Sequence, residues 1–150
     1  MIALANDHVG FEFKQELILM LKEMGLEYKD FGTTTTERVD YTRYGYLAAL
    51  AVASGECQKG ILVCGTGIGI SLAANKVKCI RCAVCSDCYS AVLSRQHNNT
   101  NMLALGARVL GPELAKMLVK MWLNADYEGG RFQVRLDHIS QIESGKVDFI

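Results

Sequence analysis

The sequence predicts an α/β protein, a Rossmann-like three-layer αβα sandwich built around a five-stranded parallel sheet. The main observation is that short apolar runs alternate with longer segments of helical periodicity from one end of the chain to the other. Glycines and short polar clusters separate most of these segments, as loops between strands and helices require. Half of the 150 residues are hydrophobic, which is enough for one core, so residues 1–150 are expected to form a single domain.

The first part of the chain is expected to contain three strands, each followed by a helix. Apolar residues at helical spacing, from Phe13 to Met24, define the first helix, and Gly25 is expected to end it. In the second helix the same spacing points Leu47 and Leu50 toward the core. The expected strands are Ile2–Ala5, Leu26–Phe31 and the run from Ile61 to Cys64, and the later two helices are Arg43–Ser54 and Ile68–Val77.

The second part continues the alternation with two further strands. Ser86-Asp87 is typical of a helix N-cap, and Gly111-Pro112 places the only proline where its missing N–H is harmless. Met117 and Met121 belong to the apolar stripe of the helix that this proline begins. The expected strands are Ile80–Cys85 and Met102–Leu105. Three helices are expected: one that begins after Asp87 and ends at about Gln96, one that begins at Pro112, and Arg131–Ser144.

The charge balance argues against a polyanionic partner. Lys plus Arg equals Asp plus Glu, at 16 each, so nothing in the overall charge indicates binding to nucleic acid or to an anionic membrane surface. No apolar run approaches the roughly 18 residues of a membrane span. The sequence therefore predicts a cytoplasmic protein.

Four cysteines, at positions 79, 82, 85 and 88, are spaced like the ligands of an iron–sulfur cluster. If residues 80–85 form a strand, period-two alternation places Cys79 and Cys85 on one face and Cys82 on the other. The side chains then cannot converge on one cluster. No metal site is expected, and these residues are interpreted as ordinary thiols.

The segment from Cys64 to Ser71 is the most informative motif. An apolar run stops at Cys64 and gives way to glycines at 65, 67 and 69 before a helix begins. Free N–H groups and the positive end of the helix dipole would bind an anion there and would favour a thiolate at Cys64. The third glycine is misplaced for a dinucleotide fingerprint, the lysine of a P-loop is missing, and so is the arginine of a cysteine phosphatase. An anion hole beside a thiol remains, and a tight turn with a buried cysteine is the alternative.

Other polar residues follow strands or lie in connections nearby. Asp7 and His8 follow the first strand, and His97 and Asn98 precede the last one. Ligands of open parallel sheets bind outside the carboxyl ends of the strands, so these residues and the glycine loop are expected to share one edge of the sheet. Arg131 and Arg135 lie one helical turn apart, and either form a solvated face or hold an anion.

Six separated motifs give this chain a resemblance to the type B ribose-5-phosphate isomerases and the related bacterial galactose-6-phosphate isomerase subunits, over essentially its full length. These motifs are Asp7-His8-Val9-Gly10, Asp40-Tyr41, the loop from Cys64 to Gly69, Ser94-Arg95-Gln96-His97-Asn98, Gly106-Ala107-Arg108, and Tyr127 to Arg131.

The resemblance implies an aldose–ketose isomerase for a phosphorylated sugar that needs no metal or other cofactor and proceeds through an enediolate. It implies that Cys64 is the base between C1 and C2, and that Thr66 with the N–H groups of Gly65, Gly67 and Gly69 holds the oxygen of the intermediate. It pairs His97 with Asp7 in opening the furanose ring. The implied phosphate ligands are His8, Arg108, Arg131 and Arg135, and the implied sugar contacts are Tyr41 and Asn98.

The resemblance also implies a homodimer or a dimer of dimers whose sites take residues from both subunits. It moves the phosphate from the glycine loop, where the loop alone suggested it, to the arginines. Thr42, Asn99 and Phe132 depart from the usual motifs. Ribose 5-phosphate is the expected substrate, six-carbon sugar phosphates such as allose or galactose 6-phosphate are alternatives, and a noncatalytic sugar-phosphate-binding module is the alternative from another class.

Overall fold

A five-stranded sheet forms the middle layer of the protein, and all its neighbouring strands are parallel. The computed structural model describes all residues from Met1 to Ile150. The strand order is β2-β1-β3-β5-β4. The strands are β1 (Ile2–Asn6), β2 (Tyr28–Asp30), β3 (Lys59–Cys64), β4 (Cys82–Val84) and β5 (Met102–Gly106). The predicted αβα class is thereby confirmed.

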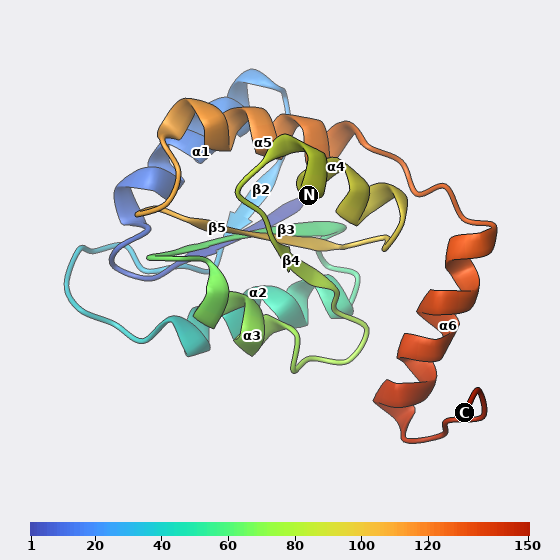
Figure 1. Ribbon diagram of the computed structural model, residues 1–150. Coiled ribbons are helices and arrows are strands. Elements are labelled where there is room, and N and C mark those ends of the chain that lie inside the picture. The colour runs from blue at the N-terminus through green and yellow to red at the C-terminus, as the bar shows by residue number, and fades with distance from the viewer.

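Helices cover both faces of the sheet (Figure 1). Helices α1, α4 and α5 lie on one face, and α2 and α3 lie on the other. The last helix, α6, stands apart from the three layers at one side of the molecule. The helices are α1 (Phe11–Glu23), α2 (Tyr41–Ala53), α3 (Ile68–Ala74), α4 (Cys88–Gln96), α5 (Pro112–Asn124) and α6 (Arg131–Ser144).

Two hydrophobic clusters hold the layers together. One contains 18 buried residues, with Leu17 of α1, Leu103 of β5 and Trp122 of α5 among them. The other contains 15 buried residues between the sheet and the α2–α3 layer. The central strands β1 and β5 are buried along their whole length, because both faces of the sheet are covered.

Local sequence signals end and begin the helices as expected. Gly25, at φ +67°, closes α1: its N–H donates to the Lys22 carbonyl, and the N–H of Leu26 donates to the Leu21 carbonyl. These two bonds are the pair that satisfies the last carbonyls of a helix ending at a glycine. Asp87 caps α4, because its side chain accepts a hydrogen bond from the Ser90 N–H at 2.7 Å. That bond also lowers the pKa of Asp87.

Several expected boundaries were wrong, and so were parts of the expected apolar faces of α2 and α5. The second and fourth strands contain only three residues each, α3 ends at Ala74, and α2 begins at Tyr41. Leu47 and Leu50 are exposed, because α2 packs through small residues instead. A Cβ on Gly45 would lie 2.8 Å from the carbonyl oxygen of Ile70, so α2 and α3 approach too closely for larger side chains. Met117 and Met121 are exposed as well.

The cysteine run falls into separate environments. Cys82 packs against the α2–α3 side of the sheet and Cys85 is buried in the opposite cluster, as the strand alternation predicted. Burial raises the pKa of the Cys85 thiol to about 11. Cys79 does not belong to the strand, which corrects its predicted face: it is exposed, with a φ of +68°. No group of three or more His, Cys, Asp or Glu side chains is arranged to hold a metal ion.

The strand order changes direction around β1 and β3, and this decides where a ligand can bind. The chain moves from β1 outward to β2, and then returns to β3 on the other side of β1. The register pairs Asn6 with Val63 and Cys64 with Gly106, so the carboxyl ends of β1, β3 and β5 come together. The crevice above such a reversal is the usual binding site of an open α/β sheet.

Candidate active site

A cleft of about 750 Å³ opens at this edge of the sheet. Segments that follow β1, β2, β3 and β5 contribute to it. Eight of the predicted site residues line it: Asp7, His8, Tyr41, Cys64, Gly65, Thr66, Gly69 and Arg108. The polar residues expected from separate parts of the chain therefore meet in one place.

Cys64 lies at the floor of the cleft and is almost fully buried. The N–H of Gly67 donates a hydrogen bond to its Sγ atom at 3.1 Å. This bond fixes the position of the sulfur at the start of α3. The resemblance places the same N–H in the anion hole, and that role of Gly67 stays a prediction.

The loop after Cys64 depends on glycine. Gly67 has a φ of +79°, and a Cβ there would lie 3.0 Å from the backbone of Leu105. A Cβ on Gly106 would lie 2.9 Å from the backbone of Thr66. The loop thus packs directly on the end of β5, which keeps the N–H groups around Cys64 in fixed positions.

Asp7 and His8 are fixed by the backbone around them. Asp7 is buried, and its Oδ1 accepts hydrogen bonds from the N–H groups of Val9 at 2.9 Å and Gly10 at 3.0 Å. The Nδ1 of His8 lies 3.3 Å from the N atom and 3.2 Å from the O atom of Val39, so either tautomer of the ring bonds to this residue. The imidazole is therefore tied to the loop between β2 and α2.

Tyr41 and Arg108 form parts of the cleft walls. The Tyr41 ring covers Gly69 so closely that a Cβ on the glycine would lie 2.5 Å from the Cζ atom of the ring. The Nη1 atom of Arg108 would lie 3.8 Å from a Cβ on Gly65. Gly69 thus leaves room for the Tyr41 ring, whereas a side chain at Gly65 would make only an ordinary contact with Arg108. Arg108 lines the same cleft as Cys64.

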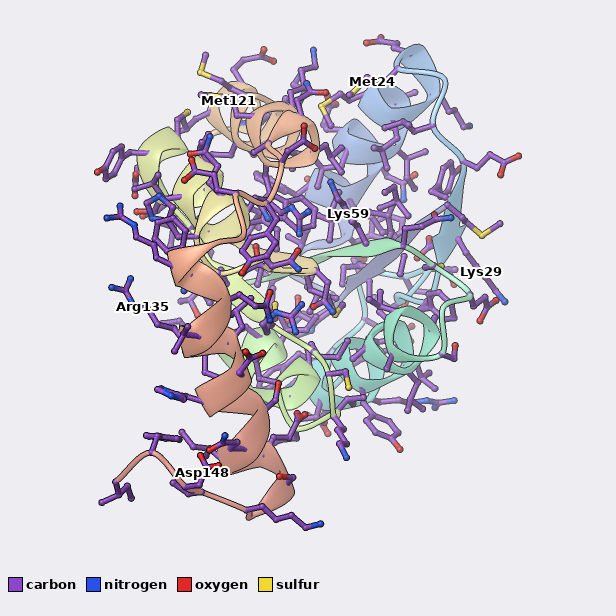
Figure 2. The ribbon with its side chains drawn as sticks, turned by 90° about the vertical axis from the view of Figure 1, so that its right-hand side faces the viewer. Met24, Lys29, Lys59, Met121, Arg135 and Asp148 are labelled. Atoms are coloured by element: carbon purple, nitrogen blue, oxygen red, sulfur yellow. The ribbon has the colours of Figure 1, made fainter.

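The other four predicted residues do not join this cleft. His97 and Asn98 lead into the start of β5, whereas Cys64 ends β3. Because the strands are parallel, the start of β5 lies at the opposite edge of the sheet. The expectation that these residues share the edge of Cys64 was therefore wrong within one chain. Arg131 and Arg135 lie on α6, away from the cleft, and Figure 2 shows Arg135 directed outward from that helix.

Three of these four residues, His97, Arg131 and Arg135, nevertheless form a second cluster. The His97 ring stacks on Phe132 with ring centroids 4.1 Å apart, and the guanidinium carbons of Arg131 and Arg135 lie 4.9 Å and 5.7 Å from the centroid of the same ring. His97 Nε2 also lies 3.9 Å from a carboxylate oxygen of Glu128. Phe132, one of the departures from the family motif, thus holds three predicted site residues together.

A buried hydrogen-bond network fixes the loop that carries His97 and Asn98. Thr100 Oγ1 accepts from Trp122 Nε1 at 2.9 Å and lies 3.0 Å from Ser94 Oγ. The Nη1 atom of Arg95 donates to the Asn99 side chain at 2.9 Å. Asn99, at φ +45°, is thereby held in a left-handed conformation that asparagine tolerates better than most residues. These contacts hold the loop that connects α4 to β5.

Sequence reasoning missed several residues that line the cleft. Arg38, Val39 and Asp40 reach it from the loop before α2, and Ile68 and Leu72 present apolar side chains from α3. Asp40 and Ile68 belong to two of the six sequence motifs, Asp40-Tyr41 and the loop from Cys64 to Gly69, so they could have been predicted as site residues. Arg38 and Leu72 carried no signal, because only the folding of their segments brings them to the cleft.

The fold and this cleft define a class of protein: a doubly wound α/β protein with a cleft for a small ligand beside a buried cysteine at the carboxyl edge of its sheet. The cleft combines a thiol, a carboxylate, an imidazole and guanidinium groups, a set suited to moving protons on an anionic substrate.

Comparison with known proteins identifies the family. The model of the family described as Ribose/Galactose Isomerase matches residues 2–139, and the chain belongs to this family. It is 58% identical to the ribose-5-phosphate isomerase B of Escherichia coli over 95% of each chain. It is 42% identical to a D-erythrulose-4-phosphate isomerase of Pectobacterium atrosepticum, over 95% of this chain and 94% of that protein.

The fold agrees with solved structures. A structure of the Clostridium thermocellum ribose-5-phosphate isomerase B superposes with a TM-score of 0.95 at 50% identity, covering 96% of this chain and 97% of that one. The resemblance inferred from the sequence motifs is thus confirmed.

Proposed function

We propose that this protein interconverts D-ribose 5-phosphate and D-ribulose 5-phosphate, a step of the pentose phosphate pathway, through an enediolate. The observation that carries the proposal is the buried Cys64 thiol, bonded to a backbone N–H at the floor of a cleft that also holds Asp7, His8 and Arg108. Family membership and the similarity to a ribose-5-phosphate isomerase B over nearly the whole chain support it.

In this reaction the Cys64 thiolate removes the proton from C2 of the open-chain aldose. The electrons form the C1–C2 double bond of an enediolate and the hydroxyl proton moves from O2 to O1, with Thr66 placed to help this transfer. The thiol then returns its proton to C1 as the C2 carbonyl forms. Thr66 and the backbone around Gly65 and Gly69 face the cleft where the negative oxygen develops. A missing donor in such a hole typically lowers the rate about a hundred- to a thousandfold. No covalent adduct forms, and the steps require neither a metal nor a cofactor.

The second cluster completes the site when a second copy of the chain brings it to the cleft. A homodimer of this kind places His97 and Asn98 of one subunit near Asp7 of the other, for opening the furanose ring. Arg131 and Arg135 then join His8 and Arg108 around the phosphate. In one chain the two sets lie at opposite edges of the sheet, so neither is a whole site by itself.

Exposed apolar side chains support this assembly. Ile68 and Leu72 are more than half exposed at the cleft, and on α6 Val134 and Ile142 are exposed to a similar degree. Helix α6 stands apart from the three layers (Figure 1) and buries only Phe132 and Leu136. We take these exposed apolar side chains, which lie on the helices that carry the two parts of the site, as surface that a second copy covers. A dimer of dimers would bury further surface in the same way.

The substrate class has one specific alternative. A protein 42% identical to this one is named D-erythrulose-4-phosphate isomerase, after a four-carbon sugar phosphate. Four- and six-carbon sugar phosphates, allose and galactose 6-phosphate among them, are therefore the second candidates. A noncatalytic sugar-phosphate-binding module is the alternative in which no turnover occurs.

The location proposed is the cytoplasm, where phosphorylated sugars are retained. No helix of the protein combines the length and the apolar composition needed to cross a membrane.

A coupled assay over a panel of tetrose, pentose and hexose phosphates tests the proposal, with and without a chelator. Cys64→Ala is expected to abolish turnover and to leave sugar-phosphate binding measurable by calorimetry. Cys79→Ala is the matched control, because Cys79 is exposed and away from the cleft. An unchanged rate in Cys64→Ala, or sensitivity to chelator, would contradict the mechanism.

A further inference from the structure

Arg38 is a cleft residue with no role in the site as described so far. It lies in the loop between β2 and α2 and is exposed to solvent. Its side chain lines the cleft together with Cys64 and Arg108. An arginine that lines a cleft is a candidate contact for an anionic ligand.

The loop that carries Arg38 is fixed on both sides of it. The buried Lys14 ammonium donates to the Thr33 carbonyl at 3.0 Å and pairs with Asp30 at 2.6 Å. On the other side, the Val39 backbone bonds to the ring of His8. Arg38 is adjacent to this bond in the chain, so its backbone is held next to the imidazole of His8.

The guanidinium of Arg38 has no partner within the protein. Asp7 and Asp40 also line the cleft, but neither lies within 4.0 Å of an arginine nitrogen, and no carboxylate pairs with Arg38 or Arg108. The Oδ1 atom of Asp7 is already occupied by two backbone N–H groups. Both guanidiniums therefore keep their donors available for a ligand.

We propose that Arg38 binds the phosphate of the substrate alongside His8 and Arg108, as a ligand that the cleft of one chain supplies by itself. This assignment rests on the proposed function, because it takes the substrate to be a phosphorylated sugar. Planar guanidinium groups bind phosphate oxygens through paired hydrogen bonds, and each such charged contact is worth about a tenfold change in affinity.

The test compares Arg38→Gln with the matched control Arg43→Gln, in which an exposed arginine on the neighbouring helix α2, outside the cleft, is changed. In Arg38→Gln the KM for ribose 5-phosphate is expected to rise about tenfold with kcat nearly unchanged, because the phosphate is remote from the proton transfer. Competitive inhibition by inorganic phosphate is expected to weaken by the same factor, and Arg38→Lys to restore part of both.

The outcomes separate this proposal from the isomerase assignment. If the wild-type protein turns over no sugar phosphate, the proposed function fails, and calorimetric binding of inorganic phosphate to wild type and Arg38→Gln still decides the role of Arg38. Equal phosphate affinity in these two proteins overturns the proposal. A loss of kcat at unchanged KM also overturns it, and so does an equal effect in Arg43→Gln.

Discussion

Mixing two inactive variants would show whether each active site is shared between two chains. One variant carries Cys64→Ala, which removes the base in the cleft. The other carries His97→Asn together with Arg131→Ala, which disables the second cluster and leaves the cleft intact. These two regions lie at opposite edges of the sheet, so each variant retains the part that the other lacks.

The expected recovery follows from the geometry of a two-fold dimer. Each site takes Cys64 from one chain and His97 with Arg131 from its partner. In a mixed dimer, one site then contains both lesions and the other contains neither. Random pairing makes half of the dimers mixed, so the sample should reach about one quarter of the wild-type rate at equal total protein.

The assay is the coupled isomerase reaction after the two variants are co-expressed, or refolded together. Each variant measured alone supplies the residual rate to subtract. A mixture of wild type with Cys64→Ala serves as the control for the independence of the two sites, because it should give about half of the wild-type rate whether or not subunits exchange. A mixed sample no more active than the two variants measured separately would refute the shared site.

Three further predictions concern stability, each measured by urea unfolding. Gly67→Ala should destabilise the protein by about 2–3 kcal/mol, because a positive φ combines with a close approach to the Leu105 backbone. Gly25→Ala has open space around it and should cost only the backbone strain, about 1 kcal/mol. Equal losses in the two variants would exclude the Leu105 contact as a cause. Cys79→Gly should stabilise the protein by up to about 1 kcal/mol, since its φ of +68° suits glycine, and a decrease would contradict this. Asp30→Ala should destabilise the protein by about 2 kcal/mol, because it leaves the buried Lys14 ammonium without its carboxylate. The loss is smaller than for a fully buried pair, since Asp30 is partly exposed. An unchanged stability would show that the hydrogen bond to the Thr33 carbonyl is enough to hold the ammonium.

The sequence by itself determined the fold class and the order of the elements. Helical and strand periodicity is local, so the alternation could be recognised without knowing how the elements pack. Glycine signals were equally local: Gly25 ends α1 as expected, and the loop after Cys64 turns through the positive φ of Gly67. The separated motifs also identified the family, because they depend only on residue identity and order.

The tertiary structure decided which residues share a site. His97 and Asn98 were expected beside Cys64 because they lie near a strand in the sequence, but they precede β5 and so occupy the other edge. Arg38 reaches the cleft only because the β2–α2 loop is held by His8 and Lys14. Leu47 and Leu50 are exposed, and α2 instead approaches α3 closely at Gly45. These outcomes depend on contacts between distant segments, which the periodicity of a single segment does not contain.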